Sequence, residues 1–209
     1  MPGNCYQAVT EAAAVRAPHN LLLHVCCGPC ALMPISRLKD EGFMVTAWFM
    51  NPNIHPLTEY LRRREAAQEC AQRHGIDILF ADDAWDVTAW LRSAVGRDMP
   101  PARCTWCCES RLTATWARAR ELGFAWFSSS LLYSRYQPHD AIVAHGRALT
   151  KQGNDTSPAF VYRDFRTDWQ VGIDTSKAWG LYRQAWCGCI YSEAERYHKR
   201  LQRCRQHSA

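Results

Sequence analysis

The chain has 209 residues, of which 47% are hydrophobic and 22% are charged, a balance that suits one folded domain and excludes wholesale disorder. Its formal net charge of +5 is a mild basic excess, which is compatible with a nucleic-acid substrate without proving one. No apolar run is long enough to span a bilayer and residues 1–20 lack the pattern of a secretory signal, so we expect a cytoplasmic protein with no membrane partner.

Strands and helices are predicted to alternate after a flexible N-terminal extension, residues 1–20, and to form a single α/β catalytic domain over residues 21–209. Strands are expected at residues 21–25, 44–49, 76–80, 124–132 and 159–163. Helices are expected at residues 31–41, 59–74, 85–95, 104–122, 139–149, 176–184 and 192–203, with Ser192 and Glu195 as a capping box for the last. This order predicts an open, mostly parallel, doubly wound (Rossmann-like) sheet flanked by helices, with its site beyond the carboxyl ends of the strands.

Three tight groups stand out among the eleven cysteines. They are Cys26 with Cys27 after the first strand, Cys104 with Cys107 at a helix start, and Cys187 with Cys189 around one glycine. An odd number of cysteines without a secretory signal argues against a disulfide framework and favours metal binding or redox chemistry. Two pairs supply four thiolates, the number that an Fe–S cluster or a structural zinc requires, and spacing alone leaves both metals open.

The remaining cysteines are less informative. Cys30 and Cys108 lie beside two of the groups, as spectators or as alternative ligands. Cys70 is expected to be a small core residue, and Cys5 and Cys204 are expected to be terminal thiols.

Five strings in the chain occur in an order that resembles the QueH family of epoxyqueuosine reductases, over residues 21–193. They are LLLHVCCGPC (from Leu21), NPNIHP (from Asn51), RCTWC followed by SRL (from Arg103), YRDFR (from Tyr162) and LYRQAWCGCIYSE (from Leu181). The resemblance implies a cobalamin-independent oxidoreductase with a 4Fe–4S cluster. Such an enzyme reduces the epoxide of epoxyqueuosine, in the wobble position of a tRNA anticodon, to queuosine.

The resemblance also implies roles for individual residues. The cluster ligands would be Cys26, Cys27, Cys104 and Cys107. Cys187 and Cys189 match a pair that is viewed either as a redox-active disulfide or as part of the site of an additional iron ion. Asp164, in the RDFR string, is the candidate aspartate for that iron.

The chain departs from the family pattern at three places. Gly28 stands where alanine is commoner, a change that is conservative in size, and Cys108 stands where an aromatic residue is usual. The stretch 134–137 (SRYQ) replaces one that more often reads Ser-Pro-Tyr-Lys. Cys108 makes the ligand set less certain, and the last change bears on substrate contacts.

Removing an epoxide oxygen requires two electrons and two protons, so the reaction needs a redox cofactor and an external electron donor. His24 and Asp164 are candidate proton donors, although a structural role for His24 is at least as well supported. The candidate contacts for a splayed base of the tRNA are Tyr133, Arg135, Tyr136, Tyr182, Arg183 and Trp186. The basic residues of the last helix form either a phosphate-binding face or a solvated surface: Arg196, Lys199, Arg200, Arg203 and Arg205.

Three other functions are compatible with parts of the pattern. A zinc-stabilised RNA-binding module would use the same cysteines without catalysis, and a thiol–disulfide oxidoreductase would need only Cys104 with Cys107, or Cys187 with Cys189. An adenylating tRNA-modification enzyme is disfavoured, because CCGPC stands where that class needs a Gly/Ser-rich phosphate loop.

Overall fold

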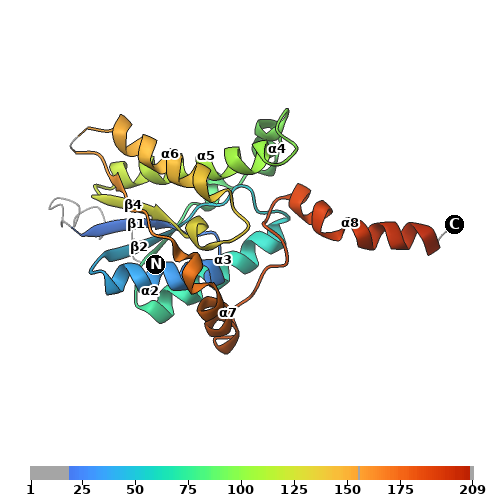
Figure 1. The fold of residues 1–209 in the computed structure, drawn as a ribbon, viewed down its shortest axis with the longest axis horizontal. Coiled ribbons are helices and arrows are strands. Elements are labelled where there is room, and N and C mark those ends of the chain that lie inside the picture. The colour runs from blue at the N-terminus through green and yellow to red at the C-terminus, as the bar shows by residue number, and fades with distance from the viewer. Residues whose placement is uncertain (1–18, 155, 208–209) are drawn as a thin grey trace, which may run out of the picture.

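A parallel sheet forms the centre of the computed structural model, which describes residues 19–154 and 156–207 (Figure 1). Its strands are β1 (Asn20–His24), β2 (Met44–Phe49), β3 (Ile78–Phe80), β4 (Trp126–Ser129) and β5 (Ala159–Phe160). They lie in the order β3-β2-β1-β4-β5, and all four pairings between these strands are parallel. The predicted doubly wound α/β fold is therefore confirmed.

Helices cover both faces of this sheet. The α-helices are α2 (Gly28–Asp40), α3 (Leu57–His74), α4 (Val87–Ala94), α5 (Ala102–Glu121), α6 (His139–Gln152), α7 (Trp169–Ala178) and α8 (Ile190–His207). The short 3-10 helices are η1 (Asp82–Ala84), η2 (Ser130–Tyr133) and η3 (Phe165–Asp168). Figure 1 shows α5 and α6 on one face of the sheet and α2, α3 and α7 on the other. No helix among the described residues is long and apolar enough to cross a membrane.

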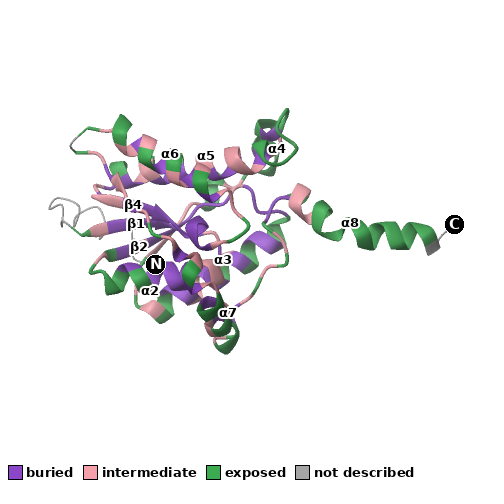
Figure 2. Cartoon of the chain, in the orientation of Figure 1, coloured by how far each residue is buried: buried purple, intermediate pink, exposed green. Residues whose placement is uncertain are grey.

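The core forms around β1, because this central strand is covered on both faces. Leu21, Leu22 and Leu23 are all 0% exposed, as expected for a strand that reads as a continuous apolar run. Phe49 of β2 and Phe127 of β4 extend the same buried layer. In Figure 2 the buried residues concentrate in the sheet and on the helix faces that point to it, whereas α8 is almost wholly exposed.

Two predictions near the C-terminal end are wrong. The helix expected at residues 176–184 ends at Ala178, because Gly180 adopts a φ of +66° and Leu181 N–H bonds back to the carbonyl of Ser176. The capping box is also wrong, since α8 begins at Ile190 and Ser192 lies inside it. The strands expected at residues 76–80, 124–132 and 159–163 are shorter than predicted.

Most of the predicted N-terminal extension, residues 1–18, lies outside the described residues, and so does Cys5. The first strand begins at Asn20, one residue earlier than expected. At the other end, α8 leaves the body of the protein as a projecting helix (Figure 1).

Candidate cysteine-lined active site

The site lies at the carboxyl edge of the sheet, between β1 and β4, where the strand order reverses. β1 ends at His24 and leads directly to Cys26 and to Cys27, the residue that precedes α2. The backbone N–H of Cys26 donates a hydrogen bond to the hydroxyl of Ser130 at 3.1 Å, which holds the turn against the end of β4. The first cysteine pair therefore lies at the edge of the sheet that the sequence pattern indicated.

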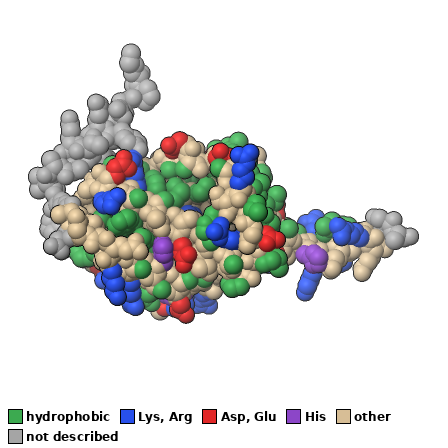
Figure 3. Space-filling view, turned by 90° about the horizontal axis from the view of Figure 1, so that it is seen from above, with side chains coloured by type: hydrophobic (Ala, Val, Ile, Leu, Met, Phe, Trp, Pro, Cys, Tyr) green, Lys and Arg blue, Asp and Glu red, His purple; other side chains and the backbone are tan. Residues whose placement is uncertain are grey.

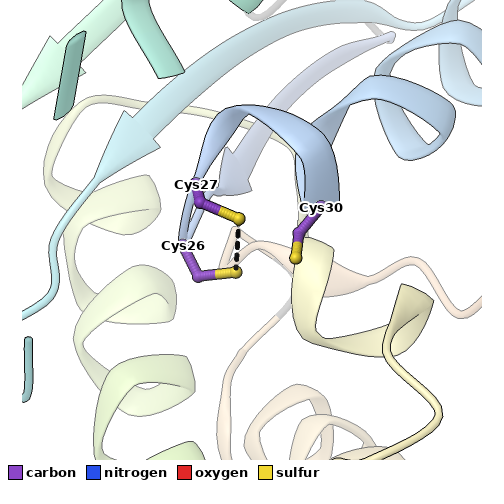
Figure 4. Close-up of side chains that lie close together, drawn as sticks. All are labelled: Cys26, Cys27 and Cys30. Carbon is purple, nitrogen blue, oxygen red and sulfur yellow. Dashed lines mark hydrogen bonds between the residues drawn. The ribbon is translucent and has the colours of Figure 1, made fainter. Parts of the chain in front are cut away.

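The thiols of Cys26, Cys27 and Cys30 form one cluster, in which the three sulfur atoms all lie within 4.8 Å of one another (Figure 4). The sulfur atoms of Cys26 and Cys27 are 3.9 Å apart. Hydrogen bonds from the other two thiols lower the pKa of Cys26 well below its usual range, while burial raises the pKa of Cys27. Cys30 joins the cluster because α2 begins at Gly28, which places Cys30 on the first helical turn.

Cys104 and Cys107 lie on one side of the first turn of α5, the former half-buried and the latter buried. Burial raises the pKa of Cys104 and, to about 11, the pKa of Cys107. The nearby thiols of Cys187 and Cys189 raise both pKa values further. The structure therefore brings the second and third cysteine groups together.

The guanidinium of Arg111 lies buried among these thiols. Its Nε atom donates to the carbonyl oxygen of Cys107 at 2.9 Å, and its Nη2 atom lies 3.7 Å from the sulfur of Cys108. Burial alone would lower the pKa of Arg111, but Cys107, Cys108 and Cys187 raise it above its usual value, so the side chain keeps its charge. A fixed positive charge favours thiolates, the form of cysteine that ligates metal. Sequence reasoning missed this role, although Arg111 is the arginine of the SRL string.

The two thiols of the CGC turn have different surroundings. Cys187 is exposed and its sulfur accepts a hydrogen bond from Gln137 Nε2 at 3.3 Å. Cys189 is only 7% exposed, and it packs with Trp90 and Cys107. The sulfur of Cys189 also accepts the N–H of Ser192 at 3.4 Å, so Cys189 occupies the N-terminal cap of α8.

A buried ion pair on α3 holds the CGC turn. Arg63 Nη1 donates to the carbonyl oxygen of Cys187 at 2.7 Å, and Arg63 Nε bonds to Glu59 at 2.7 Å. The N–H of His55 donates to the carbonyl oxygen of Gly188 at 2.9 Å. A Cβ atom at Gly188, whose φ is +146°, would meet atoms of Ile54 and Arg63 at 3.2 and 3.3 Å. The positive φ and the close approach of the NPNIHP loop and α3 therefore favour glycine between the two cysteines.

A cavity of about 760 Å³ opens beside the thiols. Its wall combines three cysteines, several aromatic rings and three arginines: Cys26, Cys30, Cys187, Tyr133, Tyr136, Trp169, Trp186, Arg111, Arg183 and Arg196. Tyr133 and Trp169 stack with their ring centroids 5.2 Å apart. Gly172 makes this stack possible, because a Cβ there would lie 2.2 Å from the Tyr133 hydroxyl. The cavity has the size and the lining of a small-molecule or nucleobase site.

We expected six residues to contact a base of the tRNA. Four of them form part of the cavity wall: Tyr133, Tyr136, Arg183 and Trp186. Arg135 is not part of the lining and instead lies 5.5 Å above the ring of Trp169. Tyr182 is also absent from the lining, because its hydroxyl donates to Glu59 in the buried network under the CGC turn.

The two candidate proton donors lie outside the described lining of the cavity. The ring of His24 is wholly buried between Ser129 (2.9 Å) and the carbonyl of Met50 (3.1 Å), and burial lowers its pKa to about 4. Asp164 pairs with Arg166 at 2.7 Å, and these hydrogen bonds lower its pKa to about 2. Both side chains are therefore occupied by structural partners.

Two of the departures from the family pattern contact each other. Cys108 donates its thiol hydrogen to Gln137 Oε1 at 3.3 Å, and the same glutamine reaches Cys187. Gly28 is not a conservative change in this chain, because a Cβ there would lie 2.3 Å from the carbonyl oxygen of Ala66. α2 and α3 therefore pack too closely for a side chain at this position.

Comparison with known proteins gives a consistent result. The family model described as "Epoxyqueuosine reductase QueH" matches residues 21–195. An epoxyqueuosine reductase QueH of Dehalococcoides mccartyi is 34% identical over 179 residues, which cover 86% of this chain and 95% of the relative. The proteins of the same name from Haemophilus influenzae and Thermotoga maritima are 35% and 32% identical, over 83% and 86% of this chain and 72% and 93% of their own lengths.

Among solved structures, the U34-tRNA thiolase NcsA from Methanococcus maripaludis with its [4Fe-4S] cluster superposes with a TM-score of 0.56. The match covers 90% of this chain and 68% of the thiolase at 13% sequence identity. At this identity the likeness shows the shared α/β fold alone.

Proposed function

Because the chain belongs to the QueH family of epoxyqueuosine reductases, we propose that it reduces epoxyqueuosine in the wobble position of a tRNA anticodon to queuosine. The proposed reaction takes place in the cytoplasm and does not use cobalamin. The observation that carries this proposal is a cavity with aromatic and cationic walls that Cys26, Cys30 and Cys187 line, with Cys104 and Cys107 next to the CGC turn. Such walls suit an unstacked nucleobase next to a redox centre.

The proposed cofactor is a 4Fe–4S cluster, and its ligands are Cys26, Cys27, Cys104 and Cys107. The donor set fits this group in kind, because Cys26 of the β1–α2 turn and Cys107 of α5 both lie near the buried Arg111, and each has a second thiol close to it in the sequence, Cys27 and Cys104. Four thiolates are the usual ligands of such clusters, and the cluster would supply electrons one at a time. Cys30 is a further thiol of the β1–α2 turn, within 4.8 Å of Cys26 and Cys27.

The reaction consumes an epoxide, two electrons and two protons, and it yields an alkene and water. Oxidation of two thiols to a disulfide releases two electrons and two protons, so the dithiol of Cys187 and Cys189 balances one turnover. An external electron donor then reduces the disulfide. Cys187 lines the cavity, where it is open to substrate, while Cys189 is shielded by Trp90.

An additional iron ion with Asp164 as a ligand stays a prediction. In this structure the carboxylate bonds to Arg166 instead, through Nε at 2.8 Å and Nη2 at 2.7 Å. An Asp164→Asn variant tests the prediction through the ratio of iron to protein. A loss of about one iron per chain would support the prediction. An unchanged ratio of iron to protein would show that Asp164 is not an iron ligand.

The chain's own residues would place the base. Tyr133 and Tyr136 approach the ring of Trp169 from two directions, at centroid distances of 5.2 and 5.8 Å, and so offer aromatic faces. Arg183 and Arg196 add positive charge to the rest of the wall. A wobble base that is splayed out of the anticodon loop would stack on the rings while its phosphates stay near the arginines.

The decisive experiment is an anaerobic incubation of the iron-loaded protein with tRNA that contains epoxyqueuosine and a low-potential reductant, followed by nucleoside analysis. Queuosine should form. The proposal fails if none forms under conditions in which a cobalamin-dependent reductase converts the same tRNA. A folded protein that carries zinc, and neither iron nor acid-labile sulfide, would instead support the RNA-binding alternative.

A further inference from the structure

α8 begins immediately after the CGC turn and then leaves the body of the protein, so residues 194–206 are all exposed (Figures 1 and 2). Its base is fixed to the body. Glu195 accepts a hydrogen bond from the buried Arg103 at 2.7 Å, and the ring of Tyr191 lies 5.0 Å from the same guanidinium. The direction of the helix relative to the cavity is therefore set by α5.

The charged side chains of α8 are mostly positive. After Glu195 the helix contains no acidic residue up to its end at His207. At about 100° per residue, four of the five Lys and Arg side chains fall within an arc of about 100° on one face of the helix, and Arg205 falls on the opposite face. The four are Arg196, Lys199, Arg200 and Arg203. Figure 3 shows Lys and Arg side chains along the part of the chain that projects from the body.

This basic stripe starts at the cavity. Ser192 and Arg196 lie four residues apart on one face of α8, and both line the cavity. The apolar side chains of Tyr197 and Leu201, which are 37% and 52% exposed, point away from that face by helical spacing. The positive charge therefore continues outward from the wall of the cavity in which the base would lie.

We propose that α8 is an arm that binds the phosphate backbone of the RNA strand flanking the base in the cavity. The inference rests on the proposed function and assigns to α8 the binding of the tRNA outside the cavity. A tRNA is a polyanion far larger than the cavity, so it must extend past the opening beside which α8 projects. Arg196 and Arg203 are seven positions apart, so the stripe spans roughly 10 Å along the helix axis. It offers positive charge to phosphates and does not read the bases.

The test replaces three residues of the stripe that do not line the cavity, as Lys199→Gln, Arg200→Gln and Arg203→Gln. The control removes the same charge elsewhere, as Arg118→Gln, Arg120→Gln and Lys151→Gln. These residues lie in the last turns of α5 and α6, at the opposite edge of the sheet. tRNA binding is measured by fluorescence anisotropy over a range of salt concentrations, without turnover.

The arm variant should bind tRNA about tenfold more weakly at low salt. The slope of log K against log salt concentration should be smaller in magnitude by about 2 to 3, because three phosphate contacts are lost. The control should bind as the wild type does. If the wild type binds tRNA and both variants bind equally well, the arm is refuted while the proposed function stands. If the wild type itself does not bind tRNA, the proposed function fails.

A projecting helix could instead contact a second copy of the chain. Sedimentation of the wild type, the arm variant and the control tests this alternative. If the arm variant changes the molecular mass in solution and leaves the affinity for tRNA unchanged, α8 contacts a second copy of the chain, and the proposal is overturned. An unchanged mass with weaker tRNA binding supports it.

Discussion

Arg63 and Cys187 are joined by a hydrogen bond of 2.7 Å between a side chain in the first third of the chain and the backbone of its last cysteine pair. The guanidinium also bonds to the carbonyl oxygen of Trp186 at 3.1 Å and to Glu59. Its side chain is only 1% exposed. The buried ion pair of Arg63 and Glu59 on α3 therefore holds the CGC turn in place.

Arg63→Met should destabilise the protein by about 3–5 kcal/mol, because it leaves the carboxylate of Glu59 buried without its charged partner. The double variant Arg63→Met, Glu59→Leu should recover much of that loss, since it removes both charges. Urea denaturation of the metal-free chains measures the difference. Equal stability of the single and double variants would show that the unpaired charge of Glu59 is not the cause of the loss.

The four proposed cluster ligands should differ from other buried thiols. Cys26→Ala and Cys107→Ala should lose iron and acid-labile sulfide after anaerobic purification, because each removes one of four thiolates. Cys30→Ala and Cys70→Ala are the matched controls, and both should keep the iron content of the wild type. Loss of iron from Cys30→Ala would instead make Cys30 a ligand and revise the set of four.

Cys187→Ser and Cys189→Ser should lower queuosine formation to the background while the content of acid-labile sulfide, which reports the cluster, stays that of the wild type. Both remove the proposed two-electron couple without touching a cluster ligand. Cys204→Ser, in the exposed part of α8, is the control and should turn over normally. Normal turnover by either variant of the CGC turn would end the proposed role of the pair.

Tyr136→Ala should raise the KM for tRNA about tenfold without a loss of stability, because base stacking on an aromatic ring contributes roughly 1–3 kcal/mol. The side chain is 86% exposed at the cavity wall, so it adds little to the core. Tyr136→Phe keeps the ring and should behave as the wild type. A variant without the ring but with an unchanged KM would place the base elsewhere.

Cys70 should make the protein less stable in alkali. Burial raises the pKa of this thiol to about 12, whereas a thiol in the unfolded chain ionises near its ordinary value of roughly 8.5. Between these pH values the unfolded state binds fewer protons, so the free energy of unfolding falls as the pH rises, by about 1.4 kcal/mol per pH unit from this group.

Cys70→Ala removes that contribution. The free energy of unfolding of the variant should therefore fall less steeply between pH 9 and pH 12 than that of the wild type, as measured by urea denaturation of the metal-free chains. Parallel curves for the two proteins would contradict the raised pKa.

The central elements could be predicted from the sequence because their signals are local. β2 has the predicted bounds, Met44 to Phe49, since its apolar run and the flanking turns lie within a few residues of one another. β1 was recognised in the same way. The helix expected at residues 176–184 is wrong because the observed helix, α7, spans Trp169–Ala178 and ends in the turn at Gly180.

The sequence by itself determined the sheet, the three cysteine groups and the placement of the first group at the carboxyl edge. Only the tertiary structure decided that Cys30 belongs to the first group, that Arg111 carries its charge among the thiols, and that Arg63 holds the CGC turn. It also placed Asp164 and Arg166 outside the described lining of the cavity. The physical reason is that strand and helix patterns depend on neighbours along the chain, whereas the surroundings of Arg111, the contact of Arg63 with the CGC turn and the lining of the cavity depend on how separate elements pack.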